Sequence, residues 1–264
     1  MTDLLSQVDL AGWGGHFAML LLRMAGLFAF IPFFGSELLP IRMRIGVAAV
    51  LAIAFVPVVA PIDPVPEGIL SWIIVGVREF AAGTGLGIAA RMIFAGVEAA
   101  AGIVAGQSGF ALANMVDPTS GDQGLSPAVF QNLLFLSLFL AADLHHMVIR
   151  ALIASYDVLP AAATIPSFGS MDSVTSLLGL RVFTIAIELA APALIVTISV
   201  DLVAALVGRA MPQVPILLVA YPLKLAAGLI AMAMLATGTG AALGWLGRTI
   251  VADGTTVIAA MAGA

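Results

Sequence analysis

Long apolar stretches with very few charged residues constrain this chain more than any other feature of its sequence. Only 9% of the residues are charged, whereas a soluble domain carries roughly 25%. Too few charged side chains are present to cover a surface that faces water. The sequence therefore predicts an all-α membrane protein whose apolar surface faces lipid or other apolar protein, and not a soluble enzyme.

Seven apolar segments approach or exceed the length of about 20 residues that a helix needs to cross the hydrocarbon core. The last two are too long for simple spans, because each helical residue rises about 1.5 Å. Pro192 in the sixth segment predicts either a tilted, kinked helix or a tight hairpin, and a possible turn at 237–240 leaves the same alternatives for the seventh. The segments cover residues 16–34, 45–59, 69–89, 92–112, 127–156, 174–207 and 216–246.

The basic residues do not follow a simple alternating topology. Arg42 and Arg44 place the first loop in the cytoplasm, but the loop at 157–172, which should lie on the same side, has no basic residue. Arg209 and Arg248 flank one apolar stretch and can both lie inside only if that stretch is a hairpin. The sequence therefore argues against an ordinary zig-zag path through the membrane.

Several classes of function lack support in the sequence. The net charge is −5 and no cluster of Lys and Arg is present, which argues against a nucleic-acid interface. No cysteine, GxSxG nucleophile elbow or phosphate-binding loop occurs. Residues 1–15 contain no basic side chain, so a cleavable signal peptide is not expected. We predict no enzyme activity and no cofactor.

Ionisable residues within the apolar segments are costly, at roughly 2.5–3.5 kcal/mol each near a bilayer centre. They must pair inside the bundle, face a water-filled path or contact partner subunits. Twelve residues raise this question: Arg23, Arg78, Glu79, Glu98, Asp143, His145, His146, Arg150, Arg181, Glu188, Asp201 and Lys224. Those predicted to be buried or to pack against other subunits are Arg78, Glu98, Asp143, His145, His146, Glu188, Asp201, Arg209, Gln213 and Lys224.

The adjacent histidines His145 and His146 raise the question of a metal site. Neighbouring residues on a helix point about 100° apart, so two such imidazoles are not expected to chelate one ion. No HExxH motif is present. We therefore predict packing or hydrogen bonding between helices, and no metal.

Small residues recur at a spacing of four, which lets helix backbones approach closely in apolar surroundings. Such spacing predicts tight helix packing, within the chain or between chains. The pairs are Gly83 with Gly87, Gly102 with Gly106, and Gly240 with Gly244.

Three stretches of the sequence together resemble one known family. They are RMAGLF at 23–28 with PIRMRIG at 40–46, GFALANMVDPTSG at 109–121 with LHH at 144–146, and GRAMPQVP at 208–215 with YPLK at 221–224. In this order and spacing they resemble the FliR family of flagellar biosynthesis proteins, which is homologous to the SctT subunit of virulence-type type III secretion systems. The resemblance covers about residues 5–250.

The resemblance implies a subunit of the export gate in the bacterial inner membrane, at the flagellar basal body. P-type and Q-type gate subunits, other export-apparatus subunits, membrane lipid and unfolded flagellar proteins are the implied partners. Such a subunit resembles a P-type and a Q-type protein fused in one chain, with long kinked helices and helical hairpins. Residues 1–264 are then one domain, with a P-like part at about 1–207 and a Q-like hairpin at about 208–264. The energy machinery lies in other subunits.

Residues 114–121 form a turn-rich run between two apolar segments. Asp117-Pro118 can open a type I turn, and Gly121 permits a positive φ. Non-helical backbone at membrane depth is tolerated only where it is buried in protein or lines a cavity. The resemblance implies a plug in the pore of the closed gate, and an ordinary exposed loop is the alternative. The residues assigned to the plug are Phe110, Asn114, Met115, Val116, Asp117, Pro118, Ser120 and Gly121.

A secondary transporter is the alternative function. The break expected at Pro192 and the intramembrane charges Glu188, Asp201 and Lys224 are features that such transporters use. No inverted repeat of two halves is evident, which weighs against this interpretation. The sequence does not distinguish a flagellar system from a virulence system, and the flagellar one is preferred.

Overall fold

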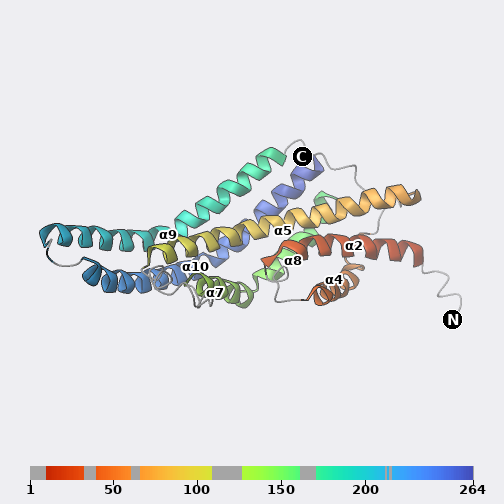
Figure 1. Cartoon of the computed structure of the whole chain (residues 1–264). Helices are drawn as coiled ribbons and strands as arrows, with labels where there is room; N and C mark the ends of the chain where they lie inside the picture. The colour runs from red at the N-terminus through yellow and green to blue at the C-terminus, as the bar shows by residue number, and fades with distance from the viewer. Residues whose placement is uncertain are drawn as a thin grey trace. The chain divides into compact units, whose positions relative to one another are not determined.

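The computed structural model describes residues 10–32, 40–60, 66–108, 127–160, 171–211, 213 and 216–263. Every regular element in these ranges is a helix (Figure 1). This confirms the predicted all-α class. The helices are α2 (Leu10–Phe30), α4 (Ile41–Phe55), α5 (Gly68–Gln107), α7 (Pro127–Ala141), α8 (Leu144–Val158), α9 (Met171–Ala210) and α10 (Ile216–Ala262).

Four helices in the described ranges are long and apolar enough to cross a membrane. They are α2, α5, α9 and α10, and α7 with α8 adds a fifth if the two form one broken span. Several of them far exceed the thickness of a bilayer. The 40 residues of α5 extend over about 60 Å, which is twice the hydrocarbon thickness of about 30 Å.

Three boundaries differ from the sequence prediction. Segments 69–89 and 92–112 were expected as two spans, but α5 is one continuous helix, because no Pro or other breaker separates them. The segment at 127–156 was expected as one run, but it is broken at Ala142 and Asp143. In the last segment, residues 237–240 are helical, so the turn considered there is wrong and α10 continues to Ala262.

The prediction for the sixth segment is resolved in favour of one helix. Residues 171–210 form α9 with Pro192 inside it, so the hairpin alternative is wrong. Pro192 has no N–H to donate to the carbonyl of Glu188, one turn earlier. Its missing bond weakens the helix at that point without ending it. Residues 208–264, expected as a hairpin, contain a single helix in their described part.

The chain divides into two compact units, and the first comprises residues 1–92, 145–178 and 247–264. In it, α2 lies along the first part of α5 (Figure 1), with glycines at the closest approach. A Cβ at Gly83 would collide with the carbonyl oxygen of Arg23, and one at Gly26 with that of Phe80. Gly87 also lies against α2, where a Cβ would be 2.8 Å from the Leu27 carbonyl oxygen. Close packing at the Gly83/Gly87 pair is thus confirmed.

The second unit comprises residues 93–144 and 179–246. Its core contains three aromatic rings from α5 and α7. The ring centroid of Phe94 lies 4.7 Å from that of Phe135 and 5.0 Å from that of Phe139. Gly96 of α5 faces Ile185 of α9, where an added Cβ would lie 2.8 Å from the Ile185 Cβ. These contacts bring α7 and α9 against α5.

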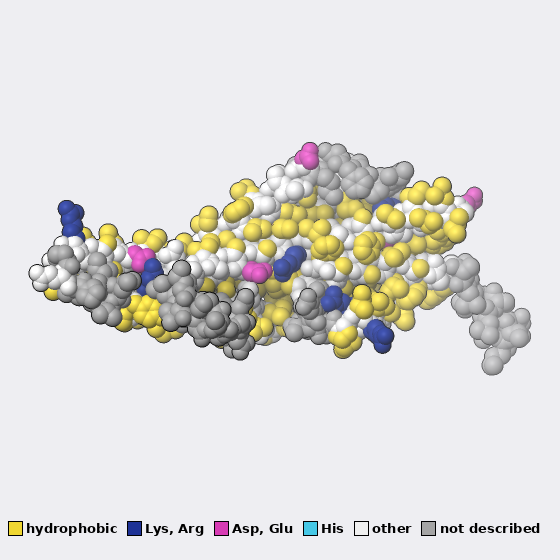
Figure 2. All heavy atoms as spheres, in the orientation of Figure 1, with side chains coloured by type: hydrophobic (Ala, Val, Ile, Leu, Met, Phe, Trp, Pro, Cys, Tyr) yellow, Lys and Arg dark blue, Asp and Glu magenta, His cyan; other side chains and the backbone are white. Residues whose placement is uncertain are grey.

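Apolar side chains cover most of the visible face, and only a few charged ones interrupt them (Figure 2). On α9 alone the exposed large side chains include Phe183, Ile187, Ile195, Leu202 and Leu206. Such a surface needs lipid or another protein against it. This agrees with the membrane residence that composition predicts.

Candidate functional sites

Arg23 is fully buried on α2, and its guanidinium group is bound on several sides. Nε and Nη2 donate to Oε2 and Oε1 of Glu79 on α5, at 2.7 and 3.0 Å. Nη1 donates to Ser155 Oγ at 2.8 Å, and Nη2 donates also to the Leu159 carbonyl oxygen at 2.9 Å. The Tyr156 ring lies 3.6 Å from the guanidinium carbon. Four of the five N–H donors of this arginine are therefore satisfied by protein.

Arg78 extends the same network. Its Nη2 donates to Glu79 Oε1 at 2.9 Å and to the carbonyl oxygen of Pro160 at 2.8 Å. Leu159 and Pro160 directly follow α8, where helix carbonyls lack partners within the helix and cations are favoured. Two arginines thus bind the C-terminal end of α8.

The network of Arg23, Arg78, Glu79, Ser155 and Tyr156 is closed to solvent. The three charged side chains are at most 2% exposed. A substrate cannot reach groups that are covered in this way. The arrangement holds α2, α5 and α8 together within the first unit, and its role is structural.

Asp201 of α9 and Lys224 of α10 form an ion pair in the second unit. Lys224 Nζ lies 2.9 Å from Oδ1 and 3.1 Å from Oδ2 of Asp201. The side chains are 29% exposed for Lys224 and 43% for Asp201. Pairing was one of the outcomes expected for charges in apolar segments, and it is confirmed for these two. Asp201 and Lys224, two of the three charges behind the transporter alternative, thus neutralise each other.

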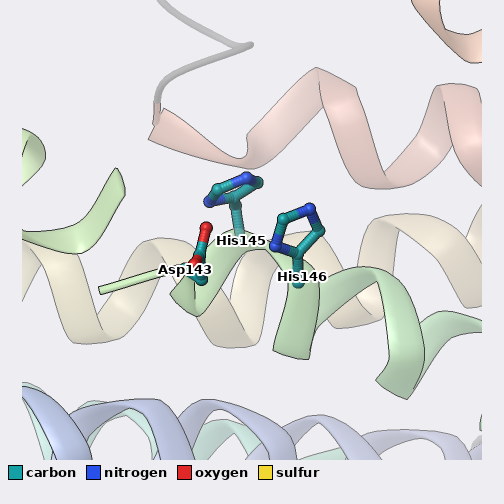
Figure 3. A group of neighbouring side chains, drawn as sticks. All are labelled: Asp143, His145 and His146. Carbon is teal, nitrogen blue, oxygen red and sulfur yellow. The ribbon is translucent and has the colours of Figure 1, made fainter. Parts of the chain in front are cut away.

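The break between α7 and α8 brings together three side chains that can bind metal ions. One ligand atom from each of Asp143, His145 and His146 lies within 4.8 Å of the others (Figure 3). Asp143 has a φ of 56°, in the left-handed region, and the centroids of the two imidazole rings are 4.1 Å apart. Because residues 143–146 are one continuous stretch of backbone, this geometry is set locally by the turn.

The expectation that adjacent histidines diverge too far to share an ion is therefore wrong. Their Cβ atoms leave the helix in different directions, but rotation of the side chains brings the rings together in the first turn of α8 (Figure 3). His145 is half-buried, and its Nδ1 atom is buried with no hydrogen-bond partner in the part of the chain that the structure describes. Asp143 and His146 are exposed.

Comparison with known proteins identifies the family. Residues 15–245 match the family described as Bacterial export proteins, family 1. This chain belongs to the FliR family. The flagellar biosynthetic protein FliR of Caulobacter vibrioides is 27% identical over 88% of this chain and 91% of its own. The FliR protein of Bacillus subtilis is 30% identical over 81% and 83%. The Yop proteins translocation protein T of Yersinia pestis is 25% identical over 79% and 80%.

The plug residues that the FliR resemblance suggests, from Phe110 to Gly121, lie outside the described residues. The helix that leads into this segment is described. Ser108, just after α5, is buried and packs against Gly228 of α10, where an added Cβ would collide with the Ser108 side chain. Ser108, the last described residue before position 109, therefore lies within the packed second unit.

The other predicted site residues of this FliR-family chain differ in how far they are exposed to solvent. Arg78 is buried as predicted, and His145, Asp201 and Lys224 are half-buried. The remaining predicted packing residues are exposed in the part of the chain that the structure describes. These exposed residues are Glu98, Asp143, His146, Glu188, Arg209 and Gln213.

Sequence reasoning left the other members of the Arg23–Arg78 network out of the predicted site. Arg23 and Glu79 were recognised as charges in apolar segments, but their 56-residue separation hid the pairing. Ser155, Tyr156 and the Leu159 carbonyl were not considered. The available signal was the opposite charge of Arg23 and Glu79, in the first and third apolar segments.

Proposed function

We propose that this chain is a structural, pore-forming subunit of the export gate of the flagellar type III secretion system in the bacterial inner membrane. Unfolded flagellar proteins are the proposed cargo, and the chain has no enzymatic role. Membership of the FliR family supports a component of bacterial export. Among the named relatives, the flagellar proteins support the flagellar system, while the Yersinia protein keeps the virulence system as the alternative.

The observation that carries the proposal is the close contact between Ser108 and Gly228. It places Ser108, the last described residue before this segment, inside the second unit and next to α10. The sequence predicts a turn-rich run at 114–121, and non-helical backbone at membrane depth must be buried in protein or line a cavity. This supports a plug at 110–121 that closes the pore.

The length and surface of α9 support assembly with P-type and Q-type subunits. Its 40 residues extend over about 60 Å, and the hydrocarbon core covers only about 30 Å of that length. Exposed apolar residues continue from Leu180 to Val207. Part of this face must therefore lie beyond the hydrocarbon core, where only other protein can keep it from water.

Affinity purification of the tagged chain with its neighbouring gene products tests the assembly. The proposal expects a stable hetero-oligomer with P-type and Q-type subunits in native mass spectrometry. Substrate-dependent transport by the purified chain alone would instead favour the secondary transporter.

Deletion of residues 110–119 tests the plug in the assembled gate. The proposal expects raised ion leakage across the membrane when the full gate is expressed. The matched control removes residues 161–170, an equally long connecting segment between α8 and α9, and leakage should stay at its original level. Unchanged conductance after the 110–119 deletion, in a gate that still assembles, contradicts the plug.

A further inference from the structure

The structural role of the buried arginine network and the proposed export function leave one cluster of side chains unexplained. Asp143, His145 and His146 place a carboxylate and two imidazoles at the break between α7 and α8 (Figure 3). Neither helix packing nor the proposed plug requires this combination. The chain has three histidines in all, and two of them lie here.

The backbone at the break makes the convergence possible. Asp143 adopts a φ of 56°, which non-glycine residues adopt rarely and aspartate more readily than most. The left-handed residue brings its carboxylate beside the first turn of α8, from which His145 and His146 project. In a regular helix through 143–146 the three side chains would spread around the axis. The break therefore gathers them on one side.

The distances suit a single small ion. Zinc bonds of about 2.0–2.1 Å in a tetrahedral site place the ligand atoms about 3.3 Å apart. The three ligand atoms already lie within 4.8 Å of one another. Asp143 and His146 are exposed, so rotation of their side chains can bring the ligand atoms to the shorter separation that zinc requires.

The donor set identifies the class of ion. Two imidazole nitrogens and one carboxylate oxygen suit zinc and neighbouring first-row transition metals, whereas magnesium and calcium prefer oxygen ligands alone. The Nδ1 atom of His145 is buried and has no hydrogen-bond partner among the described residues. A metal ion would use the lone pair of a buried imidazole nitrogen that the protein leaves unused.

We propose that Asp143, His145 and His146 bind one divalent transition-metal ion, with zinc the best match. Three protein ligands leave a fourth tetrahedral position for water or for a group from another molecule. The ion would join the residue before α8 to the first turn of that helix, and so fix the break in one conformation.

Zinc binding by the purified full chain tests the site directly. The chain carries a histidine-free affinity tag, is treated with chelator, and is titrated with ZnCl₂ by calorimetry at neutral pH. We expect one saturable zinc ion per chain, and a visible absorption spectrum typical of nitrogen and oxygen ligands when Co²⁺ replaces zinc. Replacement of one ligand in His146→Ala or Asp143→Asn should weaken binding about tenfold or more.

The matched control is His16→Leu, which removes the remaining histidine of the chain. His16 lies on α2, and both of its ring nitrogens are buried without a partner, so zinc binding should be unchanged. Because His146 and Asp143 are exposed, their variants should fold, and circular dichroism confirms this. Absence of saturable zinc binding, or equal binding by wild type and both ligand variants, overturns the site. The readout does not involve export, so it is independent of the proposed function.

Discussion

Arg23 and Glu79 form a two-point ion pair between α2 and α5, with Nε–Oε2 and Nη2–Oε1 distances of 2.7 and 3.0 Å. Both side chains are completely buried. The planar guanidinium matches the two carboxylate oxygens, and this geometry gives the strongest class of charged hydrogen bond. Removal of one partner leaves a charge in an apolar interior, which costs more than the pair itself contributes.

Glu79→Gln should strongly destabilise the chain, because Arg23 and Arg78 then keep two buried positive charges without an anion between them. We expect the free energy of unfolding to fall by about 3–5 kcal/mol. Unfolding of the purified chain in mixed micelles, followed by circular dichroism, measures this loss. Glu98→Gln on the same helix is the control: its side chain is exposed, so a change within about 0.5 kcal/mol is expected. Equal effects of the two substitutions would contradict the role assigned to Glu79.

Gly83→Ala should destabilise the packing of α2 against α5. The new methyl group would collide with the carbonyl oxygen of Arg23, so the helices must move apart, at a cost of about 1–3 kcal/mol. Gly102→Ala provides a matched comparison on the same helix, because nothing lies within 4 Å of its added Cβ. That substitution should stabilise the isolated chain by about 0.5–1 kcal/mol. Thermal unfolding of both variants measures these two effects. If Gly102→Ala alone lowered the melting temperature, the close contact assigned to Gly83 would be contradicted.

Thr239→Val should leave a buried amide without its partner. In the second unit, Gln131 Nε2 donates to Thr239 Oγ1 at 3.1 Å, and both residues are buried. Loss of the acceptor should lower the free energy of unfolding by about 1–3 kcal/mol. Adding Gln131→Leu should recover most of this loss, because both polar partners are then absent. A double variant as unstable as Thr239→Val would show that the hydrogen bond is not the cause.

Gly228→Ala should disturb the start of the proposed plug. An added Cβ at this position collides with Ser108, so Ser108 or the α10 backbone must shift. We expect the assembled gate to leak ions, though less than after deletion of residues 110–119. Ion flux into membrane vesicles measures the effect. Gly238→Ala lies on the same helix with nothing within 4 Å of its added Cβ, and should leave the flux unchanged.

The class of fold and the family follow directly from the sequence, because apolar segments and the three motif stretches are local features. The points at which individual helices continue or break are harder to predict from the sequence. Residues 89–92 of α5 contain no strong helix breaker, yet the expectation of bilayer-length spans divided the helix there. The reverse error occurred at 142–143, where no Pro or Gly marks the break. Bilayer thickness was a poor guide to helices that extend beyond it.

The same distinction applies to the sites: features set within one helix could be predicted from the sequence, and contacts between distant segments could not. The close packing of Gly83 was predictable because small-residue spacing is a property of one helix. The pairing of Arg23 with Glu79 was not, because it depends on how two segments are aligned along each other. The geometry at His145 and His146 depends on the left-handed conformation of Asp143, which sequence spacing cannot show.

The arginine network also changes how the end of α8 relates to the membrane. Helix ends in membrane proteins usually lie where water can hydrate the last carbonyl groups, so they are often used to mark the bilayer surface. Here Arg23 and Arg78 bind the carbonyl oxygens of Leu159 and Pro160 instead. These two carbonyl groups just after α8 therefore need no water for their hydrogen bonds, whereas Asp157 and Val158 in the last turn of α8 are exposed. The arginine-bound carbonyl groups of Leu159 and Pro160 are therefore no evidence of a water-facing boundary at this point of the chain.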